Sequence, residues 1–476
     1  MNQNNLSENQ QQNPWKANIG LGGSTAIVVG SMLGIGVFLA PQIVAKHVPS
    51  PSWFLLVWII GGIMAFAGAM CYGELGSKYP KAGGDYTFLK EAYGKPVAFL
   101  SGWTALTATF SGSIAATAVG LAQYYIGPHF GSWFTDPLIS LGPASISWLS
   151  LTAIGLIAVF TLINIVGVSF SSTIQGIVSF TPLIILSLAA IYSLSRGNSS
   201  SPLGSISNTI NSDHSPLPSG LGSISIDNLA LALLPVFFAY SGWNASSYVG
   251  GEIKNGKKIL PLSLLLGISL IAFLYILLNL LFLKGETINS LRQIPNILEP
   301  AALKAFGRLG VPIFISLTGF AILGSLNSTI MTGPRIYHSM AADKLLFKAV
   351  GKLSKTSRTP FNGLLIQAVI ASTFVVMGGF EDILKYTTIM IIAFSAITVF
   401  GIFILRRRTQ EDNHFKTPFH PLFPVIYLVM AVAIIATIAI TDPKQLIVSA
   451  VMTFIGIASY FIFHRTVFKR GKIDQN

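Results

Sequence analysis

Apolar residues form long uninterrupted runs along most of the chain, and short polar segments separate these runs. A helix that crosses the hydrocarbon core of a membrane needs about 20 predominantly apolar residues. Twelve runs reach this length, at residues 19–45, 52–72, 96–125, 146–168, 173–195, 228–251, 259–283, 311–334, 361–380, 386–405, 421–441 and 446–464. None of them contains Asp, Glu, Lys or Arg, so the pattern predicts an all-α integral membrane protein with twelve transmembrane helices.

The composition supports a membrane protein, because 52% of the 476 residues are hydrophobic and only 10% are charged. A soluble domain carries about 25% charged residues. The formal net charge of +13 does not indicate nucleic acid as a partner, since the basic residues lie in short loops between apolar runs. Cys71 is the only cysteine, which excludes an intramolecular disulfide and a cysteine-based metal cluster.

Loop charges predict the orientation in the membrane. If the amino terminus is cytoplasmic, the inside segments hold 22 of the 30 Lys and Arg residues but only 9 of the 17 acidic residues. This bias in Lys and Arg alone is the positive-inside pattern, and it places both termini in the cytoplasm. The expected organisation is a disordered tail over residues 1–15, a transporter core over 16–408 that contains helices 1–10, and helices 11–12 with a cytoplasmic tail over 409–476.

The first predicted span contains three glycines near its middle, Gly30, Gly34 and Gly36. Glycine destabilises a helix interior by about 1 kcal/mol relative to alanine, so the cluster favours a break in the helix. The Gly30–Gly34 spacing also matches the pattern through which membrane helices pack closely. From this span alone, close packing and breakage are equally good interpretations.

The sixth predicted span favours breakage, because its interior combines a proline with a polar step. Pro235 removes one backbone donor, and Ser241 and Gly242 are followed closely by the polar Asn244. Glycine-interrupted spans at corresponding positions of two halves indicate the binding site of a secondary transporter. The first and sixth spans each open a set of five helices, which predicts a five-plus-five inverted repeat followed by two additional helices.

Two broken helices offer opposite partial charges at the middle of a membrane. Free N–H groups at the start of one half-helix attract a carboxylate, and free C=O groups at the end of another attract an ammonium group. An α-amino acid carries both groups on one carbon atom. Because no predicted span contains a charged side chain, the backbone groups are the charge-binding elements on offer, and neutral amino acids are the predicted substrates.

Four stretches resemble the amino acid–polyamine–organocation (APC) superfamily, and within it the L-type amino acid transporter-like members. They are residues 30–38, residues 72–94, residues 238–261, and residues 324–327 with Arg335. The resemblance implies a LeuT-like fold with helices 1 and 6 broken, and transport by alternating access. It assigns the substrate-binding backbone to Gly34, Ile35, Gly36, Phe238, Ala239 and Ser241. Phe238 is also expected to close over the substrate as a gate.

Ser111 and Ser113 of the third span are candidates for the side-chain pocket, although serines in membrane helices also hold neighbouring helices together. Many members of the superfamily carry a lysine in the fifth span at the place of a sodium ion, and the corresponding residue here is Pro182. Either a cation binds instead, or the helix around Pro182 makes a cation unnecessary, and sodium dependence stays open. The candidate cation ligands are Gly30, Leu33, Ser328 and Thr329.

Other functional classes fit less well. A channel would need rings of charge or a carbonyl filter, and an enzyme would need clustered catalytic side chains. The alternative function is a cationic amino acid or polyamine transporter or antiporter of the same superfamily. The expected partners are a small amino acid substrate and membrane lipid. No metal, cofactor or nucleic acid is predicted, oligomeric state and any ancillary subunit stay open, and a bacterial inner membrane is the expected location.

Overall fold

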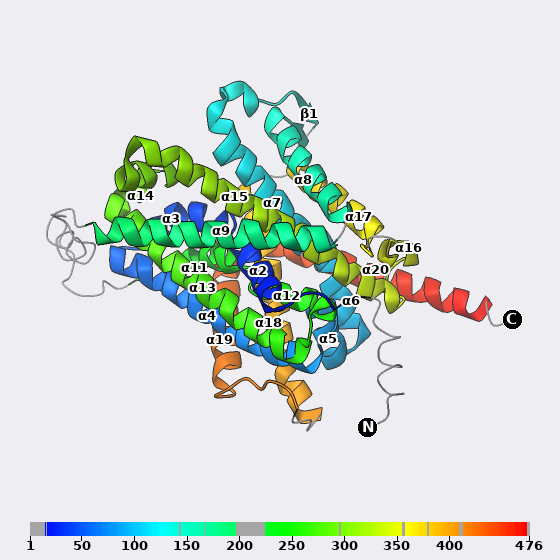
Figure 1. Ribbon diagram of the computed structural model, residues 1–476. Coiled ribbons are helices and arrows are strands. Elements are labelled where there is room, and N and C mark those ends of the chain that lie inside the picture. Colours follow the sequence, from blue (N-terminus) through cyan, green and yellow to red (C-terminus); the bar gives the residue numbers. More distant parts are fainter. Residues whose placement is uncertain are drawn as a thin grey trace.

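The computed structural model is a bundle of long helices that run roughly parallel or antiparallel to one another (Figure 1). It describes residue 15 and residues 17–141, 144–166, 168–196, 224–294, 297–354, 358–377, 380–408 and 413–473. Among these residues, nine helices are long and apolar enough to cross a membrane, and one broken pair of helices makes a tenth span. Two shorter apolar helices, α11 (Ile226–Tyr240) and α17 (Phe361–Met377), lie in two further predicted spans, and the count of twelve stays a prediction.

The first half of the bundle begins with the broken span, α2 (Leu21–Met32) and α3 (Gly36–His47), which meet at 41°. The third span is continuous but contains two π-helical turns, η1 (Ala105–Thr109) and η2 (Ala122–Ile126). The other helices of this half are α4 (Pro51–Lys78), α5 (Asp85–Tyr93), α6 (Lys95–Thr104), α7 (Phe110–Leu121), α8 (Trp148–Val166) and α9 (Val168–Ser195).

The second half begins with a second broken span, in which α11 ends at Tyr240 and the short α12 (Ala245–Tyr248) follows. After the 3-10 turn η5 (Gly250–Glu252), its further helices are α13 (Gly256–Gly285), α14 (Ile288–Leu291), α15 (Leu298–Ala342), α16 (Lys348–Gly351), α17 and α18 (Phe380–Arg408). Two helices complete the chain, α19 (Leu422–Thr441) and α20 (Pro443–Ile473).

Both predicted helix breaks are confirmed, at residues 33–35 and 241–244. Gly242 shows why the second break requires glycine. Its φ is +93°, and a Cβ atom there would lie 2.7 Å from the Cβ of Ser31 and 2.9 Å from the Ser31 carbonyl carbon. Residues with a Cβ rarely adopt this backbone conformation, and the contact leaves no space for one. The second break is therefore pressed directly against the first.

Corresponding helices of the two halves pack in corresponding ways. The second helices, α4 and α13, pack on each other, α2 packs on α13, and α11 packs on α4. Likewise α9 packs on α15, and α18 packs on α7. Each contact of a first-half helix with a second-half helix thus has a counterpart in which the two halves have swapped places. An inverted repeat predicts this arrangement.

Three features differ from the predicted pattern. A small hairpin of β1 (Ile139–Leu141) and β2 (Ala144–Ile146) interrupts the all-α architecture between α7 and α8. The predicted eighth span is part of the 45-residue α15, which contains one non-helical residue, Gly307, with φ +71°. Finally, α9 continues through Pro182, so the proline does not divide this helix.

Candidate functional site

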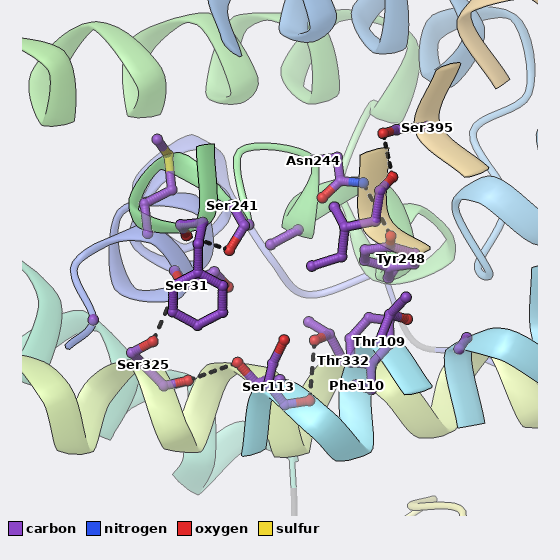
Figure 2. A pocket seen from close by; sticks show the side chains of 18 of the residues that line it. Ser31, Thr109, Phe110, Ser113, Ser241, Asn244, Tyr248, Ser325, Thr332 and Ser395 are labelled. Carbon is purple, nitrogen blue, oxygen red and sulfur yellow. Dashed lines mark hydrogen bonds between the residues drawn. The ribbon is translucent and has the colours of Figure 1, made fainter. Parts of the chain in front are cut away.

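A cavity lies where the two helix breaks meet, and all six predicted backbone-site residues line it. They are Gly34, Ile35, Gly36, Phe238, Ala239 and Ser241. Residues of α2, α5, the α6–α7 span, α12, α15 and α18 also line it (Figure 2). The cavity therefore lies between segments that are more than 200 residues apart in the sequence.

The first break presents free N–H groups to the cavity. The N–H of Gly34 is used within the break, because it donates to the Met32 carbonyl at 2.7 Å. The N–H groups of Ile35 and Gly36 have no hydrogen-bond partner in the part of the chain that the structure describes. Gly36 begins α3, so these donors lie at the positive end of its helix dipole and are suited to a carboxylate.

The second break presents the carbonyl end of α11. The Phe238 carbonyl accepts hydrogen bonds from the backbone N–H and the hydroxyl of Ser241, at 3.0 and 2.7 Å. Helix α11 ends two residues later, and the negative end of its dipole is suited to an ammonium group. Tyr275 of α13 connects the two breaks, because its hydroxyl shares its hydrogen between the carbonyls of Met32 (2.5 Å) and Ala239 (2.8 Å).

Aromatic residues around the second break divide into one that faces the cavity and two that do not. Phe238 lines the cavity and is 7% exposed. Tyr240 and Trp243 lie outside the cavity wall and are each 1% exposed. Trp243 packs edge-to-face against Tyr72 and Tyr427, which identifies it as a packing residue. Phe238 is therefore the aromatic residue of this break that contacts the cavity, and its role as a gate stays a prediction.

The two candidate serines of the third span have different surroundings. Ser113 lines the cavity beside Ser325 and Thr332 of α15 (Figure 2). Ser111 does not line it, because its buried hydroxyl donates to the Leu106 carbonyl at 2.6 Å. Ser111 thus lies away from the cavity wall, and its place in a side-chain pocket stays a prediction. Residues that are two positions apart in a helix point in directions about 200° apart around its axis, so the two serines cannot both face the same cavity.

Only one of the four candidate cation ligands contacts the cavity, and the hydroxyls of two of them already have hydrogen-bond partners. The Ser328 hydroxyl lies 2.6 Å from that of Ser31, and the Thr329 hydroxyl donates to the Ser325 carbonyl at 2.9 Å. Of Gly30, Leu33, Ser328 and Thr329, only Thr329 lines the cavity. Both hydroxyls already have partners within the protein, and the sodium dependence stays a prediction.

Gly30 of α2 lies against two polar side chains of α9, and Pro182 is not one of its nearest neighbours. A Cβ atom on Gly30 would lie 1.9 Å from the amide nitrogen of Gln175 and 2.4 Å from the Ser179 hydroxyl. The Gln175 amide also donates to the Gly324 carbonyl at 3.2 Å and accepts from Asn327 at 2.8 Å. Neutral amide groups, rather than a charged residue at the Pro182 position, thus connect α9 with α2 and α15.

The sequence patterns did not predict Asp85 as a residue of the cavity wall. Asp85 begins α5, outside every predicted span, and its side chain lines the cavity together with Asn244 and Tyr248. It is the only charged residue of the cavity wall among the described residues. The signal that could have revealed it is the Gly83-Gly84-Asp85 step directly after the second span. A short helix that starts there returns its first residue toward the bundle interior.

The comparisons with known proteins agree with this geometry. The family model described as "Amino acid permease" matches residues 19–463. The chain belongs to the amino acid permease family. It is 28% identical to the serine/threonine exchanger SteT of Bacillus subtilis (strain 168), over 95% of this chain and 98% of that protein. It is 26% identical to the human b(0,+)-type amino acid transporter 1, over 94% of this chain and 87% of that protein. It is also 26% identical to the human large neutral amino acids transporter small subunit 2, over 94% of this chain and 80% of that protein.

One end of the permease is covered by the segment before α2. Trp15 is buried, although the predicted disordered tail extended to residue 15, and the rest of that tail lies outside the described residues. Its ring lies 5.6 Å from the guanidinium carbon of Arg335 and 4.9 Å from the His338 ring. Arg335 forms a buried ion pair with Glu252, at 2.9 Å. These contacts join the amino-terminal segment, η5 and the end of α15 next to α12.

Proposed function

We propose that this permease is a secondary transporter of small neutral amino acids that works by alternating access. The observation that carries the proposal is the pairing of two helix ends across one cavity. The free N–H groups of Ile35 and Gly36 are suited to the substrate carboxylate, and the negative end of the α11 helix dipole is suited to its ammonium group. An α-amino acid carries both groups on one carbon atom and satisfies both ends at once.

The cavity wall supports small and polar side chains as the substrate class. Ten Ser and Thr residues line the cavity, and no Lys, Arg or His does so among the described residues. Hydroxyl groups both donate and accept hydrogen bonds, so they serve a neutral polar substrate without the cost of burying an unpaired charge. SteT, which is named a serine/threonine exchanger, matches nearly the whole chain and points the same way.

The alternative, a cationic amino acid or polyamine substrate, receives support from Asp85, since such a substrate needs an acidic partner. Against it, the Asp85 carboxylate already accepts hydrogen bonds from Tyr248, Thr398 and Tyr72. A substrate cation would have to displace at least one of them. The neutral class therefore remains the main proposal.

The placement in the membrane is part of the proposal. Lys and Arg are concentrated in alternate loops, which supports cytoplasmic termini. The single cysteine and the short loops support a bacterial inner membrane. Contact with lipid, the boundaries of the core at residues 16–408 and any ancillary subunit likewise stay proposals.

The deciding experiment is thermal unfolding of the purified protein with a panel of ligands, with and without sodium. A ligand that binds the folded state raises its apparent stability. We expect serine, threonine and alanine to raise the unfolding temperature, and arginine and putrescine to leave it unchanged. Stabilisation by arginine or putrescine alone would overturn the neutral class. A shift with neutral amino acids that requires sodium would support the cation site around Ser328 and Thr329.

A further inference from the structure

The Asp85 carboxylate is surrounded by neutral hydrogen-bond donors from three other parts of the bundle. Oδ1 accepts from the hydroxyls of Tyr72 in α4 and Thr398 in α18, the latter at 3.0 Å. Oδ2 accepts from the Tyr248 hydroxyl at 2.5 Å and, at 3.5 Å, from the amide of Asn244. No ion pair joins Asp85 to a Lys, Arg or His in the described ranges. An acidic group is thus held in the wall of the cavity without a counter-charge.

This arrangement favours a proton over a metal cation as the ligand of Asp85. A carboxylate has about four acceptor positions, and four donors already point at them. A metal cation on the carboxylate would have to displace at least one of these donors, because they occupy its acceptor positions. A proton, in contrast, needs no empty coordination position, because a hydroxyl is able to rotate from donor to acceptor.

We propose that Asp85 is a proton-binding site in the wall of the substrate cavity, and that its affinity for the proton changes when the cavity opens toward the α5 side. This inference rests on the alternating access of the proposed function. It adds a ligand, the proton, and a residue that binds it, to the transport of a neutral amino acid.

The contacts around Asp85 explain why opening would change its proton affinity. The segment before α5 is held on α12, because the Gly83 N–H donates to the Tyr248 carbonyl at 3.0 Å and Ala82 pairs with Val249. Gly84 has φ +48°, and a Cβ there would lie 2.4 Å from the Tyr248 ring. A path on this side needs α12 to separate from α5. That separation removes the Tyr248 and Asn244 donors and admits water to Asp85.

The direction of the coupling follows from burial. Burial raises the pKa of Asp85 above its ordinary value, and the hydrogen bonds from Tyr248, Tyr72 and Thr398 offset only part of this effect. Water that enters on opening removes the effect of burial, so the pKa falls and the proton is released. By reciprocity, a proton bound to Asp85 favours the closed arrangement, and alkaline conditions favour the open one.

Few other groups near Asp85 change charge in the same pH range. The titratable groups that face it are the phenols of Tyr72 in α4, Tyr248 in α12 and Tyr427 in α19. Tyrosine ordinarily titrates near pH 10, far above physiological pH. Thr398 of α18 and Asn244 do not titrate. At the far end of α5, Lys90 and Asp343 form an ion pair with each other, at 2.7 Å.

The test measures how accessible the cavity is from the α5 side at different pH values. Ser101 of α6 lines the cavity and is only 5% exposed, so Ser101→Cys reports on opening. Cys71 is the only native cysteine, and Cys71→Ser removes it as a background. A membrane-impermeant maleimide is applied to oriented vesicles that expose the α5 side, between pH 5.5 and 8.5 and without substrate. Labelling rates are compared between the Ser101→Cys protein that keeps Asp85 and the same protein with Asp85→Asn. The ionisation of the Cys thiol is common to both proteins, so it cancels in the ratio of the rates.

We expect the ratio of labelling rates, Asp85 over Asp85→Asn, to rise with pH. A difference of one unit in pKa between the two arrangements changes their ratio up to about tenfold. Asp343→Asn, a matched change at the contact of α5 with α15, should keep the pH dependence of the parent. Asp85→Glu should also keep the pH dependence of labelling, with the pH of half-maximal change shifted. This variant keeps the proposal testable if Asp85→Asn does not fold.

A ratio that stays constant over the pH range would overturn the proton site, as would a complete lack of labelling at any pH. Because the readout needs no substrate, it does not depend on which amino acid is carried. Failure of the neutral amino acid proposal would instead appear in the ligand panel, with the pH-dependent labelling intact.

Discussion

An ideal Cβ atom on Gly36 would lie 2.6 Å from the Cα of Ala239 and 3.0 Å from its Cβ. The start of α3 and the last turn of α11 are therefore in contact backbone to backbone. These two helix ends also supply the opposite partial charges of the proposed site. Glycine at position 36 sets the spacing between them, because a backbone neighbour cannot swing aside as a flexible side chain can.

Gly36→Ala should lower the stability of the protein and weaken substrate binding together. Overpacking of a tightly packed interior costs about 1–3 kcal/mol, and here the added methyl group pushes α3 away from α11. Thermal unfolding with and without serine measures both effects. Gly22→Ala in α2 is the matched control, because a Cβ there meets nothing within 4 Å. Equal unfolding temperatures for the two variants would contradict the contact.

Ser113→Ala should weaken substrate affinity, and Ser111→Ala should leave it close to that of the parent. Loss of one hydrogen bond costs about 0.5–1.5 kcal/mol, or about two- to twelvefold in affinity. Ser113 lines the cavity, whereas the Ser111 hydroxyl is bonded to the Leu106 carbonyl. Competition for uptake of labelled serine into proteoliposomes measures the affinities. The opposite order of effects would show that the third span is rotated relative to this structure.

Glu252→Gln should destabilise the protein strongly, because it leaves the charge of Arg335 buried without a counter-charge. Arg335 is 2% exposed and Glu252 3% exposed, and removal of one partner of a buried pair costs about 3–5 kcal/mol. The matched control is Asp442→Asn, which breaks the half-exposed pair with Lys385 and should cost at most about 1 kcal/mol. Thermal unfolding of both variants decides the matter. A loss from Glu252→Gln no larger than the control would mean that water reaches this pair.

The stability of the protein should carry a pH-dependent contribution from Asp85. The pKa of Asp85 is raised in the folded protein, so the folded state holds a proton that the unfolded state has released. The contribution is fully present below the ordinary value of 3.8 and is lost as the pH rises through the folded pKa. The unfolding temperature of the parent minus that of Asp85→Asn should therefore fall as the pH rises above 3.8. A difference that rises over this range would mean that the hydrogen bonds outweigh burial.

The sequence by itself determined the class of protein and the position of both helix breaks. Charge-free apolar runs have one stable location, the membrane, because every backbone group must be satisfied within a helix there. Glycines at 30, 34 and 36 and the step at 241–242 disfavour a continuous helix through their own conformational preferences. These are local properties of the chain, so a pattern along the chain suffices to read them. The resemblance to the APC superfamily then indicated which residues of the breaks form the site.

Only the tertiary structure decided which side chains the breaks meet. Ser111 and Ser113 are equivalent in the sequence, and the rotation of one helix separates their positions: only Ser113 lines the cavity. Asp85 lies outside every span, yet the return of α5 toward the bundle places it in the cavity wall. Tyr275 joins the carbonyls of Met32 and Ala239, which lie in different halves of the chain. Contacts of this kind depend on how separate helices pack, and no period along the sequence encodes that packing.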